Sequence, residues 1–307
     1  MSRTFIDPSV EPAVVPVVDR RVELEGFFAV LFGASVLGLS AIFVKWAAAG
    51  GATPTTIGFY RMLFALPGTY LLARRRGGVG GGAGRTWAIG AGAALFFDLW
   101  LWHLAMHHTT AANATLLVAG LSPVWVALFS VVMLHLRYDA LAWLGQALGL
   151  GGALVLALAK GARGGTGRGE ALAVIASVCY AAFTLALKRS RQTLRAEQSL
   201  FWMTASCLGC FAIVVAISRP PLDGYTPGAW GALVGLGVIV HVVGWWASSW
   251  GLGHTKAALG AIALQAQQVA TMFLAAWLLN EALKPLGLLG AGMIIGGIIL
   301  VARNRAV

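Results

Sequence analysis

Charged side chains are scarce in this chain of 307 residues. Asp, Glu, Lys and Arg together make up 11% of the sequence, against about 25% in an ordinary soluble domain. Hydrophobic residues make up 59%, whereas a water-soluble protein of this length would need a far more polar surface. The composition therefore excludes a soluble globular domain.

Cysteines and catalytic motifs are also scarce. The three cysteines, Cys179, Cys207 and Cys210, all lie in apolar stretches. Cys207 and Cys210 have CxxC spacing, but no second CxxC or His pair accompanies them, so we interpret them as small residues on one helix face. The sequence contains no nucleophile elbow, phosphate loop or pair of carboxylates. We predict no catalytic residue, no metal site and no cofactor.

Long apolar stretches fill the chain from Phe27 to Val301. A helix needs about 20 apolar residues to cross the roughly 30 Å hydrocarbon core, and runs this continuous differ from the alternating strands of a membrane barrel. We predict an all-α polytopic membrane protein with ten transmembrane helices. The predicted spans are 27–46, 55–73, 87–106, 111–134, 140–160, 169–188, 197–217, 229–251, 256–279 and 285–302.

The basic residues predict an orientation. With the N-terminus inside, fifteen Lys and Arg fall in inner segments and six in outer segments. This bias favours both termini in the cytoplasm and places the protein in the inner (plasma) membrane. Residues 1–26 lack the order of a signal peptide and are expected to form a mobile cytoplasmic tail. Because the basic residues lie in short loops beside apolar stretches, the net charge of +11 does not predict nucleic-acid binding.

The two halves of the sequence resemble each other. His108 and His254 precede the fourth and ninth spans, 146 positions apart, while Lys45 and Lys188 end the first and sixth spans, 143 positions apart. Each half holds five spans, an odd number, so two similar halves must insert with opposite orientations. Inverted repeats of this kind are typical of secondary transporters. The two five-helix inverted repeats are expected to span residues 27–160 and 169–302.

Glycines at four-residue spacing recur at matching places in the fifth and tenth spans. They are Gly145 and Gly149 in the first half, and Gly292 and Gly296 in the second. Small residues at this spacing let helices approach closely. The contact would lie either within the fold or at the seam of a dimer.

Three segments carry a family resemblance. Arg61 lies in IGFYRMLFALP near the start of the second span, small residues lead to Pro123 in HHTTAANATLLVAGLSPVWVALFSVVML, and Glu281 lies in LLNEALKPLGLLGAGMIIGGIILV. Together with the ten spans, these segments resemble the drug/metabolite transporter superfamily, EamA type, over residues 27–302. The first half departs from the pattern at Leu136, where the second half has Glu281.

The resemblance implies a secondary transporter that exports amino acids, other metabolites or drugs by exchange or proton coupling. Among such proteins the chain is most similar to exporters of aromatic and other amino acids. We predict alternating access and no enzyme activity. The alternatives are a multidrug or cation exporter of the same fold, an intramembrane enzyme acting on lipid, and a channel. The expected partners are a small-molecule substrate, the lipid bilayer and coupling protons, with the chain acting as a monomer or weak dimer.

Asp98 is the only acidic residue deep within an apolar stretch. A charge at the bilayer centre costs at least about 2.5–3.5 kcal/mol, so it normally faces a cavity or a partner. Asp98 therefore either binds an ammonium group or a proton, or pairs structurally with His or Arg. Trp102 shares its helix face, and the 146-residue offset projects that face onto Gly244 and Ser248, near His241.

Other polar and aromatic residues at mid-span complete the predicted site. Mid-span tryptophans either pack or form an aromatic wall for the substrate. Glutamines in the ninth span either contact the substrate or join helices. The candidate substrate-binding residues are Asp98, Trp100, Trp102, His103, Tyr180, Thr184, His241, Trp246, Ser248, Gln265 and Gln268.

Overall fold

Helices account for every regular element in the described part of the chain. The computed structural model describes residues 20–105, 108, 111–134, 140–159, 167–279 and 282–303. The first half contains α1 (Arg20–Leu37), α2 (Ser40–Ala49), α3 (Pro54–Arg75), α4 (Ala83–Ala105), α5 (Ala111–Leu134) and α6 (Ala140–Ala159). The second half contains α7 (Arg168–Ser190), α8 (Ala196–Ser218), α9 (Pro227–Gly235), the π-helix η1 (Leu236–Gly244), α10 (Trp245–His254), α11 (Ala257–Ala263), α12 (Ala266–Leu278) and α13 (Pro285–Arg303).

These elements follow the ten predicted spans. The first span is divided into α1 and α2 near Gly38, the eighth is α9, η1 and α10 in succession, and the ninth is divided into α11 and α12 at Gln265. The other spans are single helices. The predicted all-α fold of ten transmembrane segments is therefore confirmed, with three segments that are bent or broken rather than straight.

Length and composition agree with a membrane location. Six of the described segments are long and apolar enough to cross a bilayer, and two shorter ones are strongly apolar. At about 1.5 Å per residue, α3 and α4 are also long enough to span about 33 Å, although their Tyr, Gly, Trp and charged residues lower their hydropathy. Large apolar side chains such as Ile217 and Trp277 are more than three-quarters exposed on the bundle surface, where lipid would cover them.

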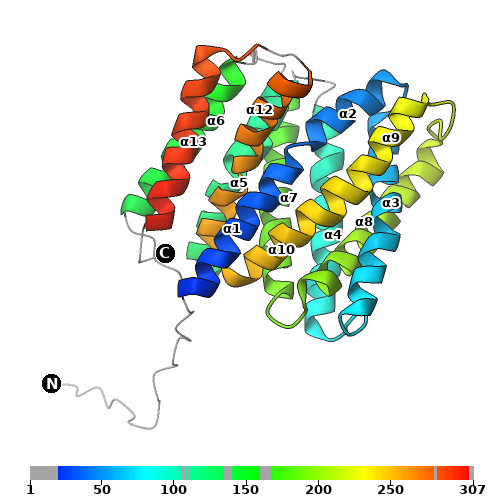
Figure 1. Ribbon diagram of the computed structural model, residues 1–307, viewed down its shortest axis with the longest axis horizontal. Helices are drawn as coiled ribbons and strands as arrows, with labels where there is room; N and C mark the ends of the chain where they lie inside the picture. Colours follow the sequence, from blue (N-terminus) through cyan, green and yellow to red (C-terminus); the bar gives the residue numbers. More distant parts are fainter. Residues whose placement is uncertain are drawn as a thin grey trace, which may run out of the picture.

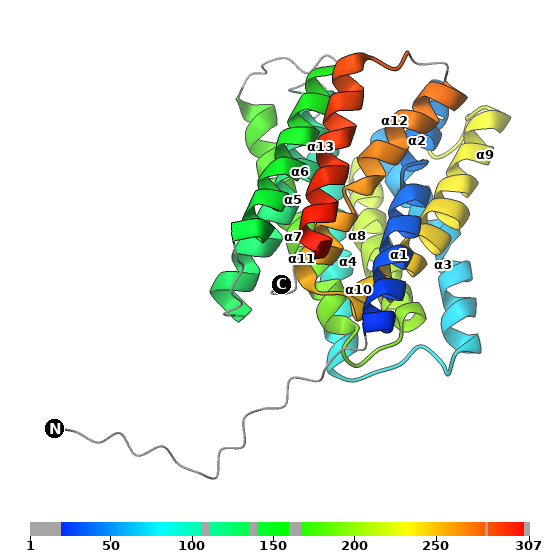
Figure 2. The same cartoon turned by 60° about the vertical axis from the view of Figure 1, so that its left-hand side comes forward.

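The chain passes up and down through one bundle. Its short connections make successive spans antiparallel, so α1 and α7, the first spans of the two halves, run in opposite directions (Figures 1 and 2). The start of α1 and the end of α13 lie at the same end of the bundle. The two halves are therefore inverted with respect to each other.

Each main helix–helix contact has a counterpart between the equivalent helices of the other half. α4 packs along α7 as α10 packs along α1, and α5 packs along α7 as α11 and α12 pack along α1. α3 packs against α8, and α6 against α13, so each of these contacts joins equivalent spans. The main contacts therefore cross between the halves, and the two repeats are interleaved.

The seam between α6 and α13 shows this symmetry at single residues. A Cβ atom placed on Gly145 would lie 3.0 Å from the carbonyl oxygen of Gly297, and one on Gly152 would lie 2.6 Å from that of Gly290. In the reverse direction, a Cβ atom on Gly297 would lie 2.6 Å from the carbonyl oxygen of Gly145, and one on Gly290 would lie 2.7 Å from that of Gly152. An offset of 145 relates Gly145 to Gly290 and Gly152 to Gly297. The two glycine pairs are therefore equivalent, as a two-fold relation between the halves requires. The seam is internal.

The partner glycines in the tenth span differ from those that the four-residue spacing predicted. A Cβ atom on Gly292 would meet nothing within 4 Å, and one on Gly296 would touch only the side chain of Leu148. Gly290 and Gly297 make the backbone approach instead. They are seven residues apart, two helical turns, which keeps both on one face.

Candidate functional site

Four polar residues, three of them buried and the fourth, Arg61, partly buried, meet where α3, α4, α8 and η1 come together. Arg61 lies on α3, Asp98 on α4, Thr204 on α8 and His241 on η1. The side chain of Asp98 is 4% exposed, and those of Thr204 and His241 are fully buried. The guanidinium of Arg61 donates a hydrogen bond from Nη1 to Ser40 Oγ at 3.3 Å. We call Arg61, Asp98, Thr204 and His241 the polar cluster.

The polar cluster consists of two equivalent pairs. Arg61 and Thr204 are 143 positions apart, and so are Asp98 and His241. Lys45 and Lys188 are related by the same offset. Each half therefore supplies one residue from its second span and one from its third, and the cluster lies where the inverted repeats meet. Substrates of inverted-repeat transporters bind at such an interface.

The first-half pair carries opposite charges. Arg61 and Asp98 interact electrostatically, yet the only ion pair within 4 Å among the described residues is the one between Arg21 and Glu25. The Nε atom of Arg61 and the Oδ1 atom of Asp98 are buried and have no hydrogen-bond partner in the described structure. Since a buried polar group normally has a partner, both residues retain the capacity to bind a further group.

The second-half pair is joined directly. Thr204 Oγ1 and His241 Nε2 are 2.9 Å apart, while Nδ1 of His241 is buried and has no partner among the described atoms. His241 lies in the nine-residue π-helix, a rare conformation that often marks functional sites. A Cβ atom on Gly237, one turn earlier, would lie 3.1 Å from the carbonyl oxygen of Arg61. The π-helix therefore lies directly against α3 at the level of the cluster.

The side chains of Asp98, Thr204 and His241 are shielded from solvent in this conformation. The structure has an apolar groove of about 360 Å³ between α1, α12 and α13, lined by residues such as Phe27, Phe273 and Ile299. None of the four cluster residues lines this groove. The groove therefore does not give access to the polar cluster.

Comparison with known proteins decides the family. The sequence profile of the EamA-like transporter family matches residues 24–158 and again residues 167–303. The chain belongs to the EamA-like transporter family. A crystal structure of a protein with 21% sequence identity has the same fold, with a TM-score of 0.77, over 92% of this chain and 98% of that one. No curated protein matches the sequence.

Membership has two consequences. The protein is a multi-pass membrane protein, and it is a transporter of small molecules, as EamA-like proteins are.

Within the described residues there is no group of three or more His, Cys, Asp or Glu side chains that could hold a metal ion.

Three of the predicted substrate-binding residues of this EamA-like transporter come together. Asp98 and His241 belong to the polar cluster, and Tyr180 on α7 interacts electrostatically with Asp98 and Arg61. Thr184, one turn after Tyr180, donates its hydroxyl to the Tyr180 carbonyl at 2.9 Å within the same helix. The hydroxyl proton of Thr184 is therefore already used within α7.

The predicted tryptophans lie apart from one another. Trp100 stacks on Phe96 with ring centroids 5.9 Å apart and is 38% exposed. Trp102 packs into an apolar cluster with Ala105 and Ala176. They do not form one wall with Trp246. The side chain of His103 lies outside the described residues.

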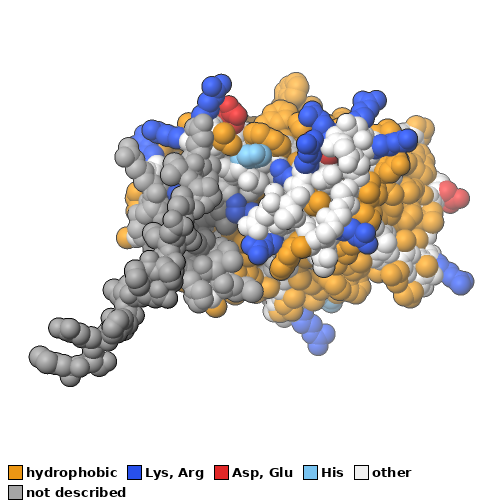
Figure 3. Space-filling view, turned by 90° about the horizontal axis from the view of Figure 1, so that it is seen from below, with side chains coloured by type: hydrophobic (Ala, Val, Ile, Leu, Met, Phe, Trp, Pro, Cys, Tyr) orange, Lys and Arg blue, Asp and Glu red, His pale blue; other side chains and the backbone are white. Residues whose placement is uncertain are grey.

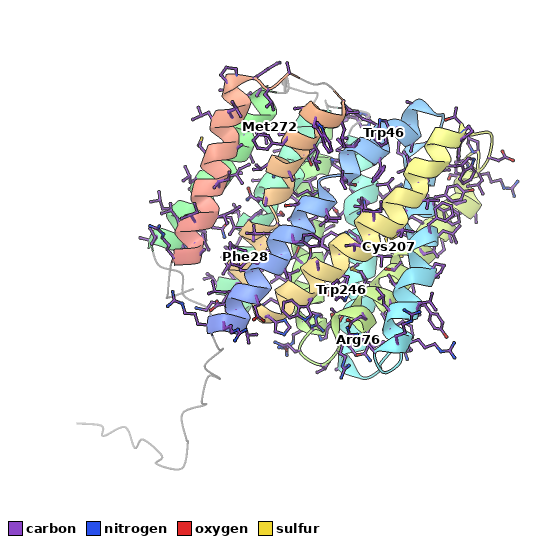
Figure 4. The ribbon with its side chains drawn as sticks, viewed as in Figure 1. Phe28, Trp46, Arg76, Cys207, Trp246 and Met272 are labelled. Carbon is purple, nitrogen blue, oxygen red and sulfur yellow. The ribbon has the colours of Figure 1, made fainter. Side chains whose placement is uncertain are left out.

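Trp246 belongs to a contact at one end of the bundle. Its Nε1 donates to Glu197 Oε1 at 2.9 Å, and Figure 4 shows it nearer than Cys207 to the end that holds Arg76. Close by, Arg191 donates to the carbonyl of Ser249 at 3.1 Å. Burial lowers the pKa of Arg191 to about 10, and nearby Glu197 opposes the shift, so Arg191 stays charged at neutral pH. Trp246 thus ties α10 to α8.

The remaining predicted residues face other helices. A Cβ atom on Gly33 would lie 2.3 Å from Ser248 Oγ, so Ser248 packs against α1. The amide of Gln265 lies against Gly149 of α6, at about 3.5 Å from the position of a Cβ. The Nε2 atom of Gln268 is buried and has no partner among the described atoms. In this conformation Ser248 and Gln265 are packed between helices.

Sequence reasoning did not place Arg61 and Thr204 in the site. Arg61 carried a usable signal, because a charged residue within a span usually faces a partner or a cavity. Thr204 carried none by itself, since a threonine within an apolar helix is commonplace. The equivalence at an offset of 143 could have found it, starting from Arg61.

Proposed function

We propose that this EamA-like protein is a secondary transporter that exports small amphipathic metabolites, with amino acids as the principal substrates, by alternating access. The observation that supports this proposal is the unsatisfied pair of Asp98 and Arg61. An acidic and a basic side chain lie within electrostatic range of each other, and each keeps a buried atom without a partner.

An amino acid complements such a pair. Guanidinium groups bind carboxylates through strong, charge-assisted hydrogen bonds, so Arg61 would hold the substrate carboxylate. The carboxyl group of Asp98 would hold the ammonium group. A zwitterion bound in this way brings one charge to each side chain and leaves the total charge of the site unchanged, which limits the free energy of burying charge.

The same pair disfavours the alternatives. A multidrug or cation exporter would place its cationic substrate beside the like charge of Arg61, which is unfavourable. An enzyme acting on lipid would need its reactive groups near a membrane face, whereas Asp98, Thr204 and His241 are buried inside the bundle. The repeats of residues 27–160 and 169–302 would move against each other, with protons or a second substrate as the coupled species.

The proposed orientation follows from charge. The end of the bundle that holds both described termini carries many Lys and Arg side chains (Figure 3), including those of the α3–α4 connection from Arg74 to Arg85. Because cytoplasmic loops are enriched in Lys and Arg, we assign this end to the cytoplasm and the protein to the inner membrane.

Transport assays on reconstituted protein test the proposal. Proteoliposomes loaded with unlabelled amino acid should take up the labelled form by exchange, and cationic drugs should neither be taken up nor compete. Asp98→Asn should reduce exchange about 10- to 100-fold, as expected for the loss of a hydrogen bond to a charged group. Asp223→Asn, the same change at an exposed site, is the matched control. Exchange of cationic drugs alone, or undiminished amino-acid exchange by Asp98→Asn, would contradict the proposal.

A further inference from the structure

The imidazole of His241 has two different ring nitrogens. Nε2 lies 2.9 Å from Thr204 Oγ1, whereas Nδ1 is buried without a partner in the described structure. Which nitrogen carries the proton depends on the hydrogen bond that its neighbour can make. The chemistry of Thr204 therefore determines what Nδ1 can do.

Thr204 has already used its only proton. Its hydroxyl donates to the carbonyl oxygen of Leu200 at 2.7 Å, one turn earlier on α8. A hydroxyl has one donor and two acceptor sites, so toward His241 the Thr204 oxygen can only accept. Nε2 of His241 must then be the donor.

The proton on Nε2 leaves Nδ1 as a free acceptor. A doubly protonated ring would bury an additional charge and would leave an N–H donor at Nδ1 without an acceptor, which is unfavourable on both counts. The neutral ring with the proton on Nε2 has a single unsatisfied site, the lone pair of Nδ1. That lone pair can be satisfied only by an N–H or O–H donor.

We propose that Thr204 holds His241 in the Nε2-protonated tautomer so that Nδ1 accepts a hydrogen bond from the amino group of the transported substrate. The inference rests on the proposed function and extends it. Asp98, which is equivalent to His241 in the other repeat, would neutralise the ammonium charge, while His241 would recognise its N–H. The site would then require a substrate with an amino group and not simply a carboxylate.

The test compares an amino acid with its des-amino analogue, which keeps the carboxylate and side chain. Affinities of the purified protein for both compounds, measured in detergent, give the discrimination by the amino group. The wild type should bind the amino acid at least about 10-fold more tightly. His241→Gln places an amide near the position of Nε2 and removes the acceptor at Nδ1, so discrimination should fall about 10-fold while affinity for the analogue stays the same.

Thr204→Val provides a second, independent variant. Without the acceptor oxygen the imidazole can exchange tautomers, and discrimination should fall about 3- to 10-fold. Thr69→Val is the matched control, because Thr69 is also fully buried but bonds only to Leu66 within its own helix. Thr69→Val should keep the full discrimination.

The outcomes separate this inference from the function on which it rests. A wild-type protein that binds no amino acid would overturn both. If the wild type discriminates and His241→Gln and Thr204→Val do so equally well, only the role of His241 is wrong. An equal loss of affinity for both compounds would show that His241 merely joins η1 to α8, and would also overturn the inference.

Discussion

The third and eighth spans occupy equivalent places in the two repeats but are built differently. α4 is one continuous α-helix that carries Asp98, whereas the eighth span passes through the π-helix that carries His241. The neighbouring helices also differ, because α3 supplies the charged residue Arg61 and α8 supplies the neutral residue Thr204. One half thus contributes a pair of charges, and the other contributes a neutral pair joined by a hydrogen bond.

This difference shows how an inverted repeat can bind an asymmetric ligand. The backbone symmetry brings four positions to one place, because α3 packs on α8 while α4 packs on α8 as η1 packs on α3. Four identical or matching side chains there would recognise the two ends of a substrate equally. Because the side chains have diverged while the scaffold is preserved, the two repeats present different chemical groups to the two ends of a substrate.

Removing a charge from the first-half pair should have the largest effect on stability. Arg61→Met removes the cation near Asp98 and the hydrogen bond to Ser40, and losing a hydrogen bond to a charged group costs about 1.5–3 kcal/mol. Thr204→Val at the equivalent position should cost only about 1 kcal/mol, because it removes a neutral hydrogen bond. The free energy of unfolding in mixed detergent micelles, measured by denaturant titration, gives both values.

A double variant sharpens the comparison. Arg61→Met with Asp98→Asn removes both charges, so it should be more stable than Arg61→Met alone. If Arg61→Met and Thr204→Val were equally destabilising, and the double variant showed no recovery, the electrostatic distinction between the halves would be wrong.

The seam between α6 and α13 should respond equally in both halves. Gly152→Ala and Gly290→Ala each direct a Cβ atom to within 2.7 Å of a backbone oxygen, and overpacking of this kind costs about 1–3 kcal/mol. Gly292→Ala meets no atom within 4 Å and should instead stabilise its helix by up to about 1 kcal/mol. The unfolding free energies of the three variants show whether each change stabilises or destabilises the protein. A destabilised Gly292→Ala would show that the seam lies elsewhere.

Much of the fold was predictable because it depends on hydropathy and repetition. The lengths of the apolar stretches predicted the ten segments, and the odd number of spans per half predicted the inversion. The bend between α1 and α2 and the break at Gln265 were not predicted. Both depend on local backbone packing, which leaves no mark on the spacing of apolar residues.

The site was predicted only in part, and the offset between the repeats explains why. An offset of 146, taken from residues after the π-helix, projected Asp98 onto Gly244, whereas the offset of 143 that relates Lys45 to Lys188 projects Asp98 onto His241. The offset therefore changes within the eighth span, after His241. A π-helix makes i→i+5 bonds and so holds more residues per turn than an α-helix, which lets this span take up additional residues. No propensity pattern in the sequence indicated that conformation.

The 146-residue offset relates Trp100 to Trp246. Changes at these two tryptophans should show the smallest difference in unfolding free energy. Trp246 donates to the buried carboxylate of Glu197, so Trp246→Phe leaves that oxygen without its donor and should cost about 1–2 kcal/mol. Trp100→Phe keeps the stacking on Phe96 and should stay within about 0.5 kcal/mol of the wild type, as surface changes do. Unfolding titrations of both variants at neutral pH make the comparison. An equal response would mean that the hydrogen bond to Glu197 contributes nothing measurable, and that the contact between α8 and α10 depends on packing alone.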